Sequence, residues 1–485
     1  MSGKMKPKRL AAGVVSASVV SAPEVSAWED DPEPAVLVNR PVPDFAKQPL
    51  AFNFPSAPPA PGVYQPGTAE FRFWTAAEAL RRGADFWAPR VAAGNWQVGP
   101  SLKVLLDAGL DLNAYYDRQA LNFFHGPGKG GTVYSGESPD IVCHEMGHAI
   151  LDTIKPQLWG AASHEAAAFH ESFADMSAIL SALQLQSLRV AILADTQGHL
   201  YRSSRLSRLA EQLGTAIRLQ APDAVDPDCL RNAVNSFTYQ DPINLPQMAP
   251  ASQLSSEAHS FSRVFTGAFF EILGGLLAAK ATAPNGPTEA DLLSVSGEIA
   301  DILVPAVQQA PVVANWYSQV AAAMVQTSAS INPAYPPILK GVFVRRSILS
   351  LNSAASVQVL QASLAAMAPR MVPTGSADPL AVIALSANDY GLDLPLLVES
   401  ASHSRQFVAK AAAVQGNGSL EPASSSTAAH AFVDDLFSRG RVDYAGLGRP
   451  EARLDHGSRL RSHRLVADNG AIRLHRCLFD CGLAH

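Results

Sequence analysis

The sequence predicts an α+β protein in which a strand-rich part, residues 69 to about 155, precedes a mostly helical part, residues 156 to about 350. Two segments carry helix start and stop signals, and the apolar stretch at 264–281, which contains Glu271, fits a core helix better than a membrane span. Of the 485 residues, 47% are apolar and 16% are charged, which excludes a largely disordered chain. A formal net charge of −6 argues against a nucleic-acid partner.

The first capped segment predicts a helix at about 139–154. Ser138 can serve as the N-cap, Pro139 suits the first helical position, and Asp140 places a carboxylate in the first turn. Lys155 and Pro156 end the segment.

This helix carries the sequence His-Glu-Met-Gly-His at 144–148. Residues four apart share one helix face, so His144 and His148 can point at one metal ion while Glu145 lies beside them. A catalytic zinc ion commonly takes three protein ligands and a water, and a carboxylate near that water can act as general base. Gly147 is a poor helix former, which indicates close packing beside the site.

A second helix is expected at about 163–185, and it supplies the third ligand. Glu171 and Asp175 are four apart, so Glu171 can reach the metal while Asp175 accepts a hydrogen bond from the other nitrogen of a ligand histidine. His164 and His170 are alternatives to Glu171 as third ligand.

The segments around this motif resemble the thermolysin-type neutral zinc metallopeptidases, in which His-Glu-x-x-His is followed by a downstream glutamate. The likeness covers roughly residues 69–345. It includes Asn-Ala-Tyr-Tyr at 113–116, a glycine-rich turn at 124–131, the helix start at 138–145, the amphipathic segment 73–87, and the segments 257–262 and 315–323.

The resemblance implies a two-lobed fold with a zinc cleft between a strand-rich and a helical lobe. It implies that Zn²⁺ is held by His144, His148 and Glu171, and that Glu145 is the catalytic base. It further implies that His259 donates a hydrogen bond to the developing oxyanion, and that Asn113 and Ala114 align an extended peptide substrate.

Three features depart from the family pattern. Twenty-two residues separate His148 from Glu171, more than is usual, so a small insertion is expected at about 159–168. No tyrosine corresponds to the one that assists the oxyanion, and Trp159 in that region has no phenolic proton. The acidic clusters that bind structural calcium are missing after Asp175, so calcium is not predicted.

The sequence therefore predicts a zinc-dependent metallopeptidase-like hydrolase that acts on a peptide or protein substrate. The alternative is a catalytically silent zinc-binding scaffold that recruits a protein partner. An aminopeptidase of the other His-Glu-x-x-His type is disfavoured, because no Gly-Ala-Met-Glu-Asn-like motif precedes the helix.

Outside the matching region, residues 1–68 form a proline-rich extension and residues 351–485 a small β-rich appendage of open role. Nine arginines between 439 and 476 alternate with acidic residues, which is typical of a solvated face. Cys143 is interpreted as a packing residue. Cys477 and Cys481 are interpreted as buried thiols, with a second metal site or a redox pair as alternatives.

The N-terminus gives mixed targeting signals, and the oligomeric state stays open. Basic residues precede a Ser- and Ala-rich apolar run at 10–22, and Val25-Ser26-Ala27 mimics a cleavage site. Alternating Val and Ser could equally form a strand. With no large propeptide before the matching region, a cytoplasmic protein is favoured over a secreted one.

Overall fold

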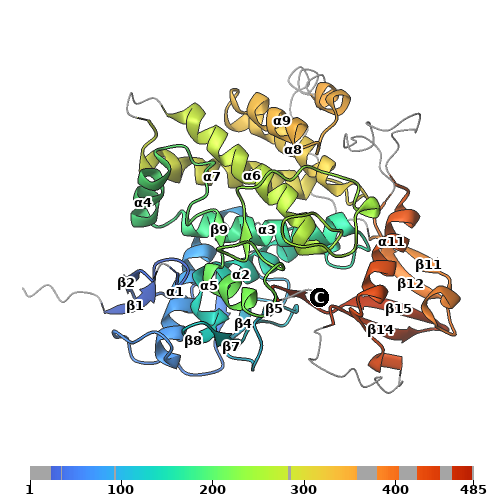
Figure 1. Ribbon diagram of the computed structural model, residues 1–485, viewed down its shortest axis with the longest axis horizontal. Coiled ribbons are helices and arrows are strands. Elements are labelled where there is room, and N and C mark those ends of the chain that lie inside the picture. Colours follow the sequence, from blue (N-terminus) through green and yellow to red (C-terminus); the bar gives the residue numbers. More distant parts are fainter. Residues whose placement is uncertain are drawn as a thin grey trace, which may run out of the picture.

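The computed structural model describes residues 23–482 apart from 34, 92–93, 282–285, 358–378, 403–422 and 448–460. It is an α+β protein with several sheets, 46% helix and 17% strand, which confirms the predicted class (Figure 1). The basic and apolar N-terminal run lies outside the described residues. The cleavage-site mimic belongs to a buried strand, β1 (Glu24–Trp28), which pairs with β2 (Leu37–Pro41).

A five-stranded sheet of order β16-β5-β6-β4-β3 supports one side of the motif helix. The sheet combines parallel pairs (β3 with β4, β4 with β6) and antiparallel pairs (β6 with β5, β5 with β16). Its strands are β3 (Ala51–Asn53), β4 (Ser101–Leu105), β5 (Ala114–Tyr116), β6 (Ala120–Phe123) and β16 (Phe479–Asp480). A hairpin of β7 (His125–Gly128) and β8 (Gly131–Tyr134) follows β6.

The helices pack as a layered bundle around α3, every residue of which is buried. Helix α3 contacts α1, α2, α6 and α8, and α7 in turn packs on α6 and α8. The bounds are α1 (Ala69–Trp87), α2 (Pro139–Ile154), α3 (His164–Ala182), α4 (Gln186–Thr196), α5 (Glu211–Arg218), α6 (Ala258–Lys280), α7 (Glu289–Gln309), α8 (Trp316–Ile331) and α9 (Tyr335–Arg345). A short pair, β9 (Arg208–Leu209) and β10 (Arg231–Asn232), lies between α4 and α6 in the sequence.

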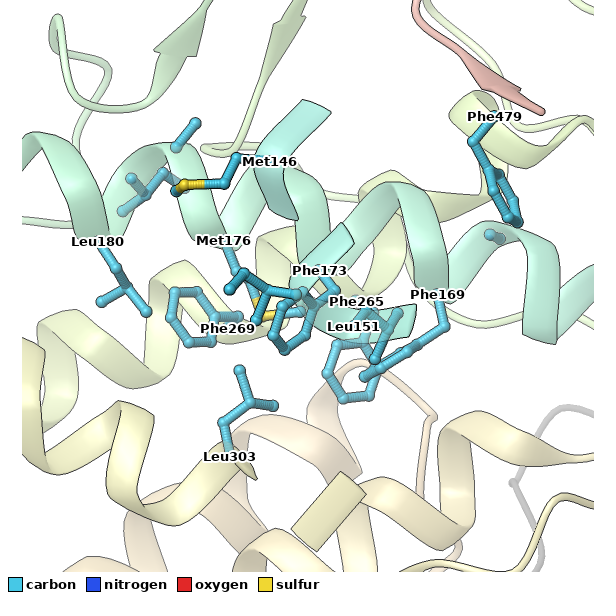
Figure 2. Close-up of a cluster of buried hydrophobic side chains, with 14 of the residues drawn as sticks. Met146, Leu151, Phe169, Phe173, Met176, Leu180, Phe265, Phe269, Leu303 and Phe479 are labelled. Atoms are coloured by element: carbon cyan, nitrogen blue, oxygen red, sulfur yellow. The ribbon is translucent and has the colours of Figure 1, made fainter. Parts of the chain in front are cut away.

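The core between these helices is aromatic and aliphatic. Figure 2 shows Phe173 of α3 and Phe265 and Phe269 of α6 packed together, with Leu303 of α7 on the far side. Helix α6 has the length and hydropathy of a membrane span, but 78% of its apolar window is buried inside the protein. Its position between α3, α7 and α9 explains why the sequence there is apolar on all sides.

The C-terminal residues build a second five-stranded sheet of order β11-β12-β15-β14-β13, with α11 (Ser425–Ser438) packed on β12. This is the orange and red part of Figure 1. Its strands are β11 (Ala381–Leu385), β12 (Leu396–Ser400), β13 (Val442–Asp443), β14 (His463–Asp468) and β15 (Ala471–Arg476).

Strands from beyond the expected boundaries at 68 and 350 join the first sheet. Strand β3, from the proline-rich extension, pairs with β4, and β16, from the C-terminal appendage, pairs with β5.

Candidate active site

Helix α2 begins and ends where the sequence predicts. The Ser138 side chain accepts a hydrogen bond from the Ile141 N–H, Pro139 is the first helical residue, and Lys155 caps the C-terminus. Helix α3 begins after Ser163, whose side chain accepts from the Ala166 N–H. These two N-cap residues set where the two helices with the candidate metal ligands begin.

Gly147 lies where α2 and α3 touch. A Cβ atom built on this residue would be 2.7 Å from the Cα of Ala174 and 2.7 Å from the Cβ of Ser177. These distances are shorter than any ordinary carbon contact, so only glycine allows this approach. The predicted close packing is confirmed, and it brings the ligands of one helix within reach of the other.

The structure brings His144, His148 and Glu171 together. The Nε2 atom of His144 lies 3.3 Å from Oε2 of Glu171, and Nε2 of His148 lies 3.7 Å from Oε1. Two atoms that each bind a tetrahedral zinc ion at 2.0–2.1 Å are roughly 3.3 Å apart. The spacing of these donor atoms therefore fits a single ion.

The three side chains are 3% exposed or less, and their inward atoms have no hydrogen-bond partner among the described residues. These atoms are Nε2 of His144, both ring nitrogens of His148 and Oε2 of Glu171. Burial lowers the pKa of His148 well below its usual value, so the ring is neutral and its lone pair is available. Buried polar atoms rarely go without a partner, and a metal ion would satisfy this set.

Asp175 holds His144 in orientation, as the sequence predicts. Its Oδ1 lies 3.0 Å from Nδ1 of His144, which leaves Nε2 of that ring facing Glu171. Arg231 on β10 donates two hydrogen bonds to the same carboxylate, from Nη2 to Oδ1 at 2.8 Å and from Nε to Oδ2 at 3.3 Å. Although burial opposes ionisation, Arg231 and His144 hold the pKa of Asp175 well below its usual range. Arg231 was not predicted from the sequence, because a strand of two residues has no recognisable sequence pattern.

Glu145 is completely buried beside the ligands, and burial raises its pKa to about 8. Neither of its oxygens makes a hydrogen bond of ordinary geometry within the described chain. One of them, a ring nitrogen of His144 and the Sγ of Cys481 all lie within 4.8 Å of one another. A carboxylate with a raised pKa next to a metal position suits proton transfer near neutral pH.

His259, at the start of α6, meets the same group. Its Nε2 is 3.2 Å from Oε2 of Glu171, and its Nδ1 is 2.7 Å from Oε1 of Glu257. Burial disfavours the charged ring, but the carboxylates of Glu171 and Glu257 outweigh it and raise the pKa of His259 to about 9. The ring is therefore a cationic hydrogen-bond donor at neutral pH.

The two alternative third ligands lie elsewhere. The Nε2 atom of His164 is 2.6 Å from Oδ2 of Asp435 on α11, where it joins the helical part to the C-terminal sheet. The His170 ring stacks on Phe479 with a centroid distance of 4.0 Å. Neither histidine belongs to a group of metal-ligand spacing in the described part of the chain.

Asn113 and Ala114 lie at the sheet edge next to the site, but their surroundings differ from a free substrate edge. Both are buried, and Oδ1 of Asn113 accepts from the Ala114 N–H at 2.8 Å. The outer side of β5 is covered by β16, and the Cys481 N–H donates to the Ala114 carbonyl at 2.9 Å. The chain's own C-terminal segment thus occupies this edge.

Trp159 and the residues after it form a loop before α3, where the insertion is expected. Its indole N–H donates to the Arg476 carbonyl at 3.3 Å, and Nε of Arg476 donates back to the Trp159 carbonyl at 2.9 Å. The Ala162 N–H donates to the Glu399 carbonyl. The loop therefore binds the C-terminal sheet.

The burial expected of the cysteines is confirmed for Cys143 and Cys481 and is wrong for Cys477. Cys143 is buried with its Sγ 3.5 Å from the Ala79 carbonyl, as expected of a packing residue. Cys477 is half-buried and its Sγ lies 3.8 Å from Arg464. Cys481 is not a plain core thiol, because it adjoins His144 and Glu145. The spacing of two cysteines four apart could not reveal a neighbour so distant in the sequence.

A cavity of about 380 Å³ borders the site on the side of His259 and Arg231. Cys481 and Gly482 form part of its wall. Residues 481–482 therefore border open space that a longer peptide could enter.

A second buried group contains Asp31, Asp140 and Glu211, which come from three distant segments and have metal-ligand spacing. Burial raises the pKa of Asp31 to about 7, that of Glu211 to about 9 and that of Asp140 well above its usual value. The missing acidic clusters after Asp175 argued against calcium in the sequence, and no acidic metal site of this kind was predicted. Asp140 lies on α2 one turn before His144, so this helix contributes residues to both groups.

We expect the free energy of unfolding to fall as the pH rises, because the folded state holds the protons of this group more tightly than the unfolded chain. Glu211 is deprotonated in the unfolded chain above about pH 4.3 but keeps its proton in the folded state up to about 9, so the free energy of unfolding falls over that window. The slope should reach up to about 1.4 kcal/mol per pH unit, and Glu211→Gln should flatten it. Urea unfolding from pH 5 to 9, in buffer free of calcium and magnesium, would measure this; equal slopes in both proteins would contradict it.

Comparison of the chain with models of known protein families gave no match, and comparison with curated protein sequences gave none either. The function is therefore argued from the geometry of the site.

Proposed function

We propose that the protein is a zinc-dependent peptidase with a two-lobed thermolysin-like fold. The observation that carries the proposal is the set of buried donor atoms on His144, His148 and Glu171. They come from two helices, have the spacing of a tetrahedral zinc site and lack hydrogen-bond partners in the described chain. Two imidazoles and one carboxylate are a ligand set found in catalytic zinc sites, which keep a position open for water.

When bound, zinc supplies a water molecule acidified enough to attack a peptide carbonyl. Glu145 would take the proton of that water and pass it to the leaving amine. His259 would donate from Nε2 to the oxyanion that develops on the carbonyl, and Glu257 would keep that ring charged. Asp175 and Arg231 would hold His144 in the orientation that binding requires.

Glu171→Ala should remove most of the bound zinc. With free zinc a thousandfold above the wild-type Kd, the variant should also lose roughly 4 kcal/mol of folding stability, because ligand binding adds to the folded state. Elemental analysis of the purified protein and thermal unfolding with added zinc would measure both. Undiminished zinc in the variant would remove Glu171 from the site and favour His170 in its place.

Glu165→Ala is a matched control for this experiment. Glu165 lies on the same helix and is equally buried, but its oxygens accept from Tyr239 Oη and the Tyr317 N–H. This variant should lose stability and keep its zinc.

A silent zinc-binding scaffold is the second candidate, and one observation favours it. Strand β16 covers the peptide-binding edge of β5, which leaves a substrate no access to that edge in this conformation. If zinc-loaded protein cleaves no peptide in a broad library even after β16 is displaced, the scaffold is the correct interpretation.

A further inference from the structure

The segment 479–482 lies where an extended peptide substrate would lie. Phe479 pairs with Tyr116 and Asp480 with Tyr115 in antiparallel register, and the Cys481 N–H donates to the Ala114 carbonyl. Adding a strand to an exposed sheet edge is a general mode of peptide recognition, because the edge offers unpaired N–H and C=O groups. Here the added strand comes from the same chain.

The side chains of this segment are seated in the site. The Phe479 ring stacks on His148 at 5.0 Å and on His170 at 4.0 Å, and it meets Trp159 edge to face. In Figure 2 this ring projects from the red strand toward the helices. The ring therefore covers His148, a proposed zinc ligand.

The backbone and the acidic side chain of Asp480 are also held. Its carbonyl accepts from Nε2 of His259, which is the donor that the proposed mechanism assigns to the oxyanion. Its carboxylate pairs with Arg441, a buried residue at the start of β13. Gly482 lies against Asn113, because a Cβ there would come within 2.6 Å of the Asn113 amide. Four successive residues thus engage the site.

The Cys481 thiol lies beside the proposed base and one proposed zinc ligand. It is 2% exposed, and its Sγ shares one cluster with a ring nitrogen of His144 and an oxygen of Glu145. The thiol and the Glu145 carboxyl group are close enough to interact, so the segment reaches the position where the base would act. Thiolate is among the preferred ligands of zinc.

We propose that residues 479–482 are a built-in inhibitor, which adds to the edge of β5 as a strand and places the Cys481 thiolate in the fourth ligand position of the zinc ion. The inference rests on the proposed zinc site. If zinc is bound, the S–H bond of Cys481 would break, its proton would pass to the adjacent Glu145, and the thiolate would replace the water that completes the zinc site. The segment would thus exclude the nucleophilic water, occupy the base Glu145 and cover the edge of β5 at the same time.

The decisive measurement is X-ray absorption on the zinc-loaded wild-type protein. One sulfur scatterer at about 2.3 Å is expected, together with nitrogen and oxygen at 2.0–2.2 Å. Cobalt-substituted protein should show a sulfur-to-cobalt charge-transfer band in the near ultraviolet. Both signals should vanish in Cys481→Ser and persist in Cys477→Ser, which changes a half-buried thiol four residues earlier.

Peptide cleavage provides the second readout. Cys481→Ser, and independently Phe479→Ala, should cleave an unstructured protein substrate at least about tenfold faster than wild type, because an intramolecular competitor acts at an effective concentration in the millimolar range. Cys477→Ser should match wild type. Full zinc with only nitrogen and oxygen around it in the wild-type protein would overturn the inhibitor and leave the zinc site standing. Wild-type protein that binds no zinc would refute the proposed function itself.

Discussion

Glu145→Gln is expected to reduce peptide turnover by about 10²–10⁴-fold while zinc stays bound, because the amide keeps the size of the side chain and cannot take a proton. Glu145 is completely buried, and burial raises its pKa to about 8, which is close to the working pH of such a base. Turnover would be measured in the Cys481→Ser background as well as in the wild-type chain, with zinc content determined on the same samples.

The matched control is Glu165→Gln. Burial also raises the pKa of Glu165 to about 8, but this carboxyl group lies among Tyr239 and Tyr317, away from the zinc ligands. Its replacement should leave turnover within a few-fold of the parent, which separates loss of the base from loss of a buried carboxyl group. Turnover that survives in Glu145→Gln would show that another group removes the proton.

His259→Ala should lower kcat by about 10²–10³-fold with little change in KM or zinc content, because an oxyanion donor acts mainly in the transition state. His259 contacts Glu171, and Glu171 and Glu257 raise the pKa of its ring to about 9, so it is the donor that the proposed mechanism uses. Steady-state kinetics on an unstructured substrate, in the Cys481→Ser background, would separate kcat from KM.

His170→Phe serves as the comparison for His259. His170 is a completely buried histidine whose ring nitrogens have no hydrogen-bond partner in the described structure, and phenylalanine keeps its contact with Phe479. No fall in kcat is expected there. A similar fall in both variants would mean that packing around the site, and not hydrogen-bond donation, was lost.

The two helices that carry the proposed ligands could be predicted from the sequence because their signals are local. Ser138 and Ser163 mark the helix starts, and the spacing of His144 and His148 follows the helical repeat. The same periodicity predicted Asp175 behind His144. Each of these inferences needed only a window of a few turns.

The partners from distant segments could not be predicted in this way. Arg231 lies on a two-residue strand and Cys481 follows another, and strands of that length have no detectable pattern. Their roles arise from pairing with β9 and β5, which the chain reaches only by folding. The buried group of Asp31, Asp140 and Glu211 has the same origin, since three separate segments supply its members.

The complete burial of α3 has a consequence for how the protein opens. A helix without a solvent side cannot fray or unwind on its own, because each turn is packed against neighbouring helices. Amide hydrogens around Glu171 should therefore exchange only through global unfolding, at the slowest rates in the chain. Glu171, the proposed zinc ligand on this helix, is therefore part of a unit that should open only as a whole, whereas β16 forms two residue pairs with β5.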